Sequence, residues 1–147
     1  MKSIHDFAGL DARTAPYALL LLRLALGAMW ISHALLKILV FTLPGASGFF
    51  ESVGLPGFLV YPVVAAEIVG GIAVTSGFHG RYASLFLLPI LLVAAWVHFP
   101  NGWVFTATGG GWEYPVFLAI ASVVHALAGD GALSVRLPRL HLATSAA

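Results

Sequence analysis

Hydrophobic residues dominate the chain in four long stretches, which are separated by short segments rich in glycine, proline and polar residues. The stretches cover residues 17–41, 58–76, 82–99 and 114–128. An α-helix needs roughly 20 apolar residues to cross the ~30 Å hydrocarbon core of a bilayer, and helices are expected because each span must satisfy its own backbone polar groups. The pattern therefore predicts an all-α integral membrane protein, a four-helix bundle that forms a single membrane domain over residues 1–147.

Composition supports a membrane protein and excludes several other classes. Hydrophobic residues make up 60% of the chain and charged residues 9%, whereas a soluble domain carries about 25% charged residues. The net charge of +1 provides no basic surface for phosphates, which argues against nucleic-acid binding. The chain has no cysteine, so thiol redox chemistry and cysteine-bound Fe–S clusters are excluded. Any redox role would have to use a bound cofactor such as a quinone.

The positions of lysine and arginine predict the orientation of the bundle. Lys2 and Arg13 precede the first span, Arg81 lies between the second and third, and Arg136 and Arg139 follow the fourth. The two loops on the opposite side carry no lysine or arginine. Because cytoplasmic loops are enriched in these residues, we expect both termini in the cytoplasm and the protein in the inner (plasma) membrane.

Ionisable residues inside the apolar spans are the candidates for a functional site, because a charge at mid-bilayer depth costs about 2.5–3.5 kcal/mol on insertion scales. Glu67 lies near the middle of the second span. Arg23 lies in the inner half of the first span, and its long side chain is expected to be able to reach that carboxylate. The candidates for a ligand or proton site are Arg23, His33, Lys37, Glu67, His98 and Glu113. No residue is assigned a catalytic role, and no metal ligand is assigned.

Helical periodicity places these polar groups on inward faces. At about 100° per residue, one face of the first span carries all of its polar groups. That face contains Arg23, Gly27, Trp30, His33 and Lys37. The second span places Glu67, Gly70, Gly71 and Val74 on one face, where the small residues favour close approach of a neighbouring helix.

Each candidate also has a purely structural interpretation. A pair between Arg23 and Glu67 would either serve a function or only fix the register of two helices. His33 would be either part of a site or a core histidine that is bonded to a carbonyl. His98 and Glu113 fall at about the same depth on two other spans, where they would either join the site or lie in the interface with water.

Several short motifs, taken in order, resemble the DoxX family of small four-helix membrane proteins. They are Arg23-Leu24-x-x-Gly27, His33-Ala34-x-x-Lys37, Glu67-x-x-Gly70-Gly71, Gly110-Gly111-x-Glu113 and Gly129-Asp130-Gly131-Ala132-Leu133-Ser134. The resemblance covers about residues 15–135. It implies an inner-membrane protein with a buried polar site and a link to quinone-dependent oxidoreductases, because the family takes its name from a subunit associated with such an enzyme. The chain departs from the family pattern at Arg136, where the family often has an acid.

The sequence is compatible with three functions, and it does not decide whether the protein is an enzyme. The first is a membrane component of an oxidoreductase system that binds a quinone and works with a redox protein partner. The second is a non-enzymatic module that binds or transports a small lipid, a proton or a metabolite, and that forms a homo-oligomer. The third is a metal or haem site, with His33 and His98 as ligands alone or together with Glu113. Quinone is the favoured cofactor, and haem or metal is less favoured.

Overall fold

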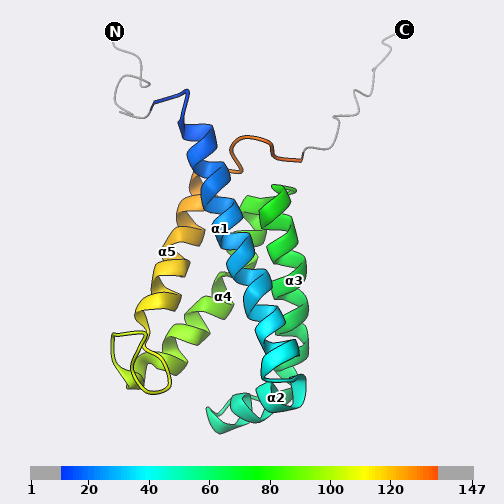
Figure 1. Cartoon of the computed structure of the whole chain (residues 1–147), viewed down its shortest axis with the longest axis vertical. Helices are drawn as coiled ribbons and strands as arrows, with labels where there is room; N and C mark the ends of the chain where they lie inside the picture. Colours follow the sequence, from blue (N-terminus) through cyan, green and yellow to red (C-terminus); the bar gives the residue numbers. More distant parts are fainter. Residues whose placement is uncertain (1–10, 136–147) are drawn as a thin grey trace, which may run out of the picture.

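The computed structural model describes residues 11–135, and over that range the chain contains helices and no strand (Figure 1). The predicted all-α fold is confirmed. The helices are α1 (Ala15–Leu35), α2 (Leu43–Ser52), α3 (Val60–Ser76), α4 (Gly80–His98) and α5 (Glu113–Ala128). A π-helical turn, Leu36–Val40, continues α1, and short 3₁₀ turns at Gly57–Leu59 and Phe99–Asn101 precede α3 and follow α4.

Within residues 11–135, three helical segments are long and apolar enough to cross a membrane. They are Ala15–Val40 with 26 residues, Gly57–Ser76 with 20 residues and Gly80–Asn101 with 22 residues. Helix α5 is also apolar but has 16 residues, which gives it a length of about 24 Å. The protein is therefore a multi-pass helical membrane protein whose apolar helices contact the lipid bilayer.

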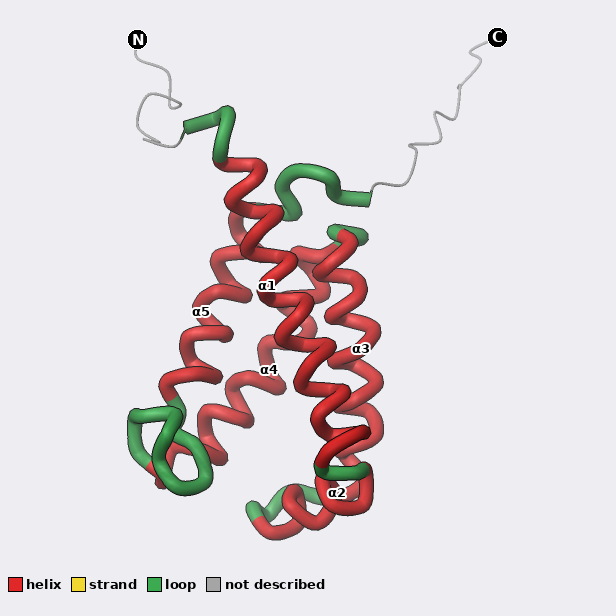
Figure 2. Tube along the Cα trace, in the orientation of Figure 1, coloured by secondary structure: helices red, strands yellow, loops and turns green. Residues whose placement is uncertain are grey.

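The helices form two antiparallel pairs, α1 with α3 and α4 with α5 (Figure 1). We call the end where α1 and α4 begin, and where α3 and α5 end, the proximal end. Figure 2 shows that the two pairs diverge toward the opposite, distal end, which carries α2 and the loop 102–112.

The inward face predicted for the second span is confirmed, whereas that of the first span is confirmed in part, because His33 and Lys37 are only half-buried. The buried residues of α1 are Arg23, Leu26, Gly27, Trp30 and Ala34. The buried residues of α3 include Glu67, Gly70, Gly71 and Val74. A Cβ atom added to Gly27 would lie 2.9 Å from the carbonyl oxygen of Gly71, so the absence of a side chain allows the two backbones to approach closely.

Two groups of apolar side chains hold the bundle together. The central group joins α1, α4 and α5 and consists of Trp30, Leu87, Leu91 and Ala119. The distal group joins α1, α2 and α3, and consists of Ala34, Ala46, Val60 and Val64. The candidate ionisable residues therefore lie in a bundle whose interior is otherwise mainly apolar, where a charge needs a partner.

Helix α2 was not expected, because the segment from 43 to 57 was interpreted as turn-rich. Its N-cap is Thr42, whose hydroxyl accepts a hydrogen bond from the Gly45 amide at 3.3 Å. Pro44 lies in the first turn of the helix, where its missing amide proton carries no cost. The proline and glycines that indicated a loop are thus compatible with a short helix, which buries Ala46 against the distal core.

Candidate functional site

A buried ion pair between Lys37 and Glu67 forms the centre of the candidate site. The Lys37 Nζ atom lies 2.7 Å from Glu67 Oε1 and 2.9 Å from Oε2. The Glu67 side chain is 3% exposed and the Lys37 side chain 18% exposed. Of the two charged partners, the lysine is therefore the one that a small molecule can reach.

The predicted approach of Arg23 to Glu67 is wrong. Gly71 packs between Gly27 and Ile31, and Glu67 lies one turn before Gly71 in the antiparallel helix. Glu67 is therefore about level with residue 33 of α1, and Arg23 is about ten residues, or roughly 15 Å, away along the axis. Side chains on a helix also lean toward its N-terminus, which directs Lys37 toward Glu67 and Arg23 away from it.

Arg23 instead binds the segment that follows α5. Its Nη2 atom donates hydrogen bonds to the carbonyl oxygens of Ala132 at 3.0 Å and Leu133 at 2.9 Å. Arg23 is 2% exposed, so this contact is buried at the proximal end. The first and last parts of the described chain are thereby fastened together.

His33 lies next to the ion pair and contacts α5. Its Nδ1 atom donates to the carbonyl oxygen of Met29 at 2.8 Å, which agrees with the interpretation of a histidine bonded to a carbonyl. Its ring also stacks on Tyr114, with ring centroids 5.9 Å apart and an angle of 19° between the planes. The Tyr114 hydroxyl is buried and has no hydrogen-bond partner among the described residues. Lys37 Nζ lies 3.5 Å from the backbone carbonyl oxygen of His33, which is one helical turn away, so His33 and Lys37 lie on the same side of the helix.

His98 and Glu113 make contacts within the distal loop. His98 Nδ1 donates to the Gly109 carbonyl oxygen at 2.9 Å, and Glu113 Oε1 accepts a hydrogen bond from the Phe105 amide at 2.9 Å. Within residues 11–135, no group of three or more histidine or acidic side chains is placed to hold a metal ion. The set of two histidines and one carboxylate that was considered for a metal is therefore not assembled.

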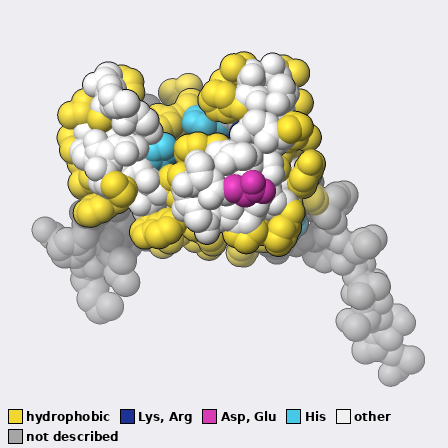
Figure 3. Space-filling view, turned by 90° about the horizontal axis from the view of Figure 1, so that it is seen from below, with side chains coloured by type: hydrophobic (Ala, Val, Ile, Leu, Met, Phe, Trp, Pro, Cys, Tyr) yellow, Lys and Arg dark blue, Asp and Glu magenta, His cyan; other side chains and the backbone are white. Residues whose placement is uncertain are grey.

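Viewed from the distal end, the two helix pairs form two lobes with a depression between them (Figure 3). Histidine side chains lie in this depression (Figure 3). A mainly apolar pocket of about 310 Å³ occurs at the same end and is lined by Val53 at the end of α2 and by four residues of and after α4. Those four residues are Trp96, Val97, Phe99 and Pro100.

A second polar cluster, which was not predicted from the sequence, lies at the proximal end. The Ser84 hydroxyl lies 2.8 Å from His125 Nδ1, and His125 Nε2 lies 3.3 Å from Asp130 Oδ1. Ser84 and His125 are both fully buried. The sequence signal was present, because Asp130 belongs to the closing Gly-Asp-Gly motif, but nothing in the sequence linked that motif to a serine on α4.

Together, the apolar spans and the buried Lys37–Glu67 pair define a small multi-pass membrane protein with an internal ionic site. The profile of the DoxX family matches residues 18–100. A protein of Bacillus subtilis (strain 168) named "Putative oxidoreductase CatD" is 31% identical over 116 residues, which are 79% of this chain and 82% of that protein. No solved structure matches the chain. The chain belongs to the DoxX family.

Proposed function

We propose that this protein is the membrane component of an oxidoreductase system, and that a quinone headgroup binds beside the Lys37–Glu67 pair. The observation that carries the proposal is the partly exposed lysine ammonium held by an almost fully buried carboxylate. The name of the Bacillus relative, which describes an oxidoreductase, agrees with a redox role. The proposal places the protein in the inner membrane, where quinones are dissolved in the lipid.

The donors at this site suit the oxygen atoms of a quinone. A lysine ammonium has three N–H groups, and two of them are directed at the two oxygens of Glu67. The third has only a 3.5 Å contact, with the His33 carbonyl, which is a weak hydrogen bond. That N–H group can donate to a quinone oxygen without breaking the ion pair. The Tyr114 hydroxyl is buried without a hydrogen-bond partner among the described residues, and it would be a second donor to a ligand that displaces the side chains covering it.

The surroundings suit the flat ring and the apolar tail of a quinone. The nearly parallel rings of His33 and Tyr114 form a surface on which a quinone ring can stack. The apolar distal pocket between the ends of α2 and α4 provides a place for part of an isoprenoid tail. A ligand of this kind needs a mainly apolar slot with a few directed polar groups.

The chemistry balances if a partner protein supplies the electrons. A quinone takes up two electrons and two protons to become a quinol. The electrons come from an electron-donating redox protein that docks on this chain. Lys37 would supply the protons, one at a time, to a bound quinone oxygen, and water at the exposed side of Lys37 would replace each of them. Glu67 keeps the lysine charged and correctly oriented between turnovers.

Two measurements test the proposal. Mass spectrometry of lipids extracted from the protein, purified from its native membrane in mild detergent, should find a stoichiometric quinone. Titration with decylubiquinone in dodecyl maltoside, followed by quenching of tryptophan fluorescence, should reach saturation, because Trp30 is buried on the same face of α1 as Lys37.

The informative variant is the double substitution Lys37→Met/Glu67→Leu, because it removes both charges and leaves no unpaired one. We expect the double variant to fold and to lose quinone binding by about tenfold or more. Glu51→Gln is the control, since Glu51 is an exposed carboxylate on α2. If the double variant binds decylubiquinone as tightly as the unmodified protein, the ion pair is structural and the proposal is wrong.

A further inference from the structure

Arg23 is a buried cation without a counter-ion in the described part of the chain. Its side chain is almost fully buried at 2% exposure, and the ion pairs formed within residues 11–135 do not include it. The two N–H groups on Nη2 serve the carbonyl oxygens of Ala132 and Leu133. The remaining three N–H groups, on Nε and Nη1, have no acceptor among the described residues. A permanent charge in this state strongly favours an anion nearby.

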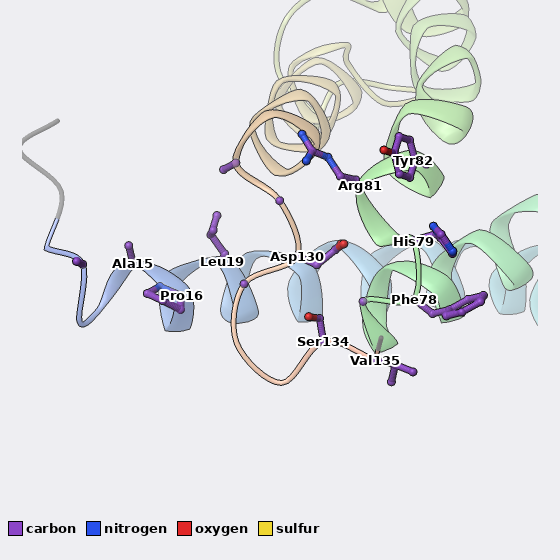
Figure 4. Close-up of a pocket in the computed structure, with 15 residues that line it drawn as sticks. Ala15, Pro16, Leu19, Phe78, His79, Arg81, Tyr82, Asp130, Ser134 and Val135 are labelled. Carbon is purple, nitrogen blue, oxygen red and sulfur yellow. The ribbon is translucent and has the colours of Figure 1, made fainter. Parts of the chain in front are cut away.

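The unpaired side of Arg23 lies against the wall of a cavity. A Cβ atom added to Gly77, at the end of α3, would collide with Arg23 Nη1 and would lie 2.7 Å from the Cβ atom of Ser134. Gly77 and Ser134 both line a cavity of about 850 Å³ at the proximal end (Figure 4). The guanidinium group is thus separated from the cavity by a residue without a side chain, and its charge acts across that wall.

The lining combines a second cation with an apolar side. Arg81 lines the cavity and is held by the end of α5, because its Nε atom donates to the Ala126 carbonyl oxygen at 3.0 Å. Across the cavity, Ala15, Pro16 and Leu19 of α1 form an apolar wall (Figure 4). Such a lining suits a molecule that carries an anionic group beside an apolar part.

One acid, Asp130, lies among the described residues that line the cavity. Asp130 Oδ1 lies 3.3 Å from His125 Nε2, and it lies beside Gly80 in the first turn of α4, where the helix dipole favours a carboxylate. The N-terminus of α4 therefore compensates part of the charge of Asp130, whose Oδ1 atom has no hydrogen-bond partner among the described residues. Among the described residues that line the cavity, Arg81 is the arginine that an incoming anion would meet, and the charge of Arg23 acts from behind Gly77.

We propose that this proximal cavity binds the phosphate group of an amphiphilic or soluble ligand, with Arg23 and Arg81 as its counter-charges. A phosphate presents several oxygen acceptors and matches the arginine donors. The group is carried either by the headgroup of an anionic membrane lipid, whose chains would lie along the apolar wall of α1, or by a soluble phosphate compound. The site lies at the opposite end of the bundle from the proposed quinone site and does not depend on it.

The test uses full-length protein in dodecyl maltoside, a detergent without phosphate. One arm adds dioctanoyl phosphatidylglycerol and the other adds inorganic phosphate, while native mass spectrometry and the unfolding temperature report binding. Stabilisation by the lipid alone would identify a headgroup site. Stabilisation by inorganic phosphate at similar concentrations would identify a site for soluble phosphates. Failure of both probes to bind would overturn the proposal.

Variants locate the binding. Arg81→Gln and Arg23→Gln should each weaken binding about tenfold or more. Arg13→Gln, an exposed arginine at the same end, is the matched control and should change affinity less than about twofold. Equal losses in Arg13→Gln would mean only non-specific attraction to surface charge. Because Arg23→Gln also removes the bonds to Ala132 and Leu133, Arg23→Lys serves as a second variant that keeps the charge.

A further variant examines whether the chain supplies its own anion. Asp6 lies outside the described residues, and Asp6→Asn should leave the affinity for the two probes unchanged. If Asp6→Asn instead lowers the unfolding temperature as Arg23→Gln does, with neither probe bound, then Asp6 is the counter-ion and the proposal is wrong. Decylubiquinone binding should be unaffected by Arg81→Gln, so the two proposed sites can fail separately.

Discussion

Lys37 binds both carboxylate oxygens of Glu67, at 2.7 and 2.9 Å, although the two residues lie 30 positions apart in the chain. This contact joins the π-helical turn that continues α1 to the middle of α3. Because Glu67 is 3% exposed, its charge depends on the lysine for compensation. We therefore expect the pair to stabilise the fold in addition to its proposed role in ligand binding.

Removing one partner of the ion pair should destabilise the protein more than removing both. We expect Glu67→Gln and Lys37→Met each to lower the free energy of unfolding by about 3–5 kcal/mol, because each leaves a buried polar group without its partner. Lys37→Met/Glu67→Leu should recover most of this loss. Chemical unfolding in detergent micelles, followed by circular dichroism, measures the three values. The prediction would be contradicted if the double variant lost as much free energy of unfolding as a single variant, or as much as the two single variants together.

The close approach of α1 and α3 depends on Gly27. In Gly27→Ala, the new methyl group would lie 2.9 Å from the Gly71 carbonyl oxygen and collide with Thr75. The helices must separate, and we expect a loss of about 1–3 kcal/mol in the free energy of unfolding.

Gly48→Ala is the matched control for this substitution. Gly48 lies within α2 and a Cβ atom there would meet no atom within 4 Å. Alanine is the better helix former, so the control should stabilise the protein by up to about 1 kcal/mol. The unfolding temperatures of both variants give the comparison, and a Gly27→Ala protein as stable as Gly48→Ala would exclude tight packing at this position.

The buried bond between Ser84 and His125 should contribute to the stability of the proximal end. Ser84→Ala leaves the His125 Nδ1 atom without a partner in a fully buried position, and we expect a loss of about 1–3 kcal/mol. Ser32→Ala, at an exposed serine of α1, should change the stability by less than about 0.5 kcal/mol. Thermal unfolding of the two variants under the same conditions tests this expectation. Equal unfolding temperatures for Ser84→Ala and Ser32→Ala would show that the bond does not contribute to stability.

Much of the fold could be predicted from the sequence because buried residues recur at the period of the helix. Arg23, Gly27 and Trp30 lie on one face of α1 by spacing alone, and the structure buries all three. The same argument succeeds for Glu67 and Gly70 on α3. Spacing along a helix gives the inward face directly, because each residue turns the face by a fixed angle.

The partner of Glu67 was not predicted correctly from the sequence, because the sequence of one helix does not determine its register against another helix. Depth estimates place Arg23 and Lys37 on either side of Glu67. The N-terminal lean of helical side chains decides between them, and it favours Lys37. The lean selects Lys37 only once the close contact of Gly27 with Gly71 has set the register of the two helices.

The contacts at the two ends depend on loops, where periodicity gives no information. Arg23 binds carbonyl oxygens of Ala132 and Leu133, and backbone carbonyls leave no signal in the sequence. Helix α2 was hidden by Pro44 and Gly45, which also occur in turns. The family motif that ends at Ser134 indicated that the closing segment mattered, but not which side chain it would meet.

His33 and His98 should respond differently to substitution, because one lies beside the ion pair and the other holds the distal loop. His98→Leu removes the hydrogen bond to the Gly109 carbonyl oxygen, while Asn101 still bonds Gly109 and Gly110. We expect amide hydrogen exchange in the loop 102–112 to rise by about tenfold, which corresponds to one lost bond. Decylubiquinone binding should stay unchanged.

His33→Leu should give the opposite result, because the ring that stacks on Tyr114 is lost while the loop keeps its own bonds. We expect weaker decylubiquinone binding by about fivefold to tenfold, for the loss of an aromatic contact, with exchange in the loop 102–112 unchanged. Hydrogen-exchange mass spectrometry and the quenching titration on both variants complete the test. If His98→Leu, rather than His33→Leu, weakens quinone binding, the ligand lies in the distal loop and the proposed site must be moved there.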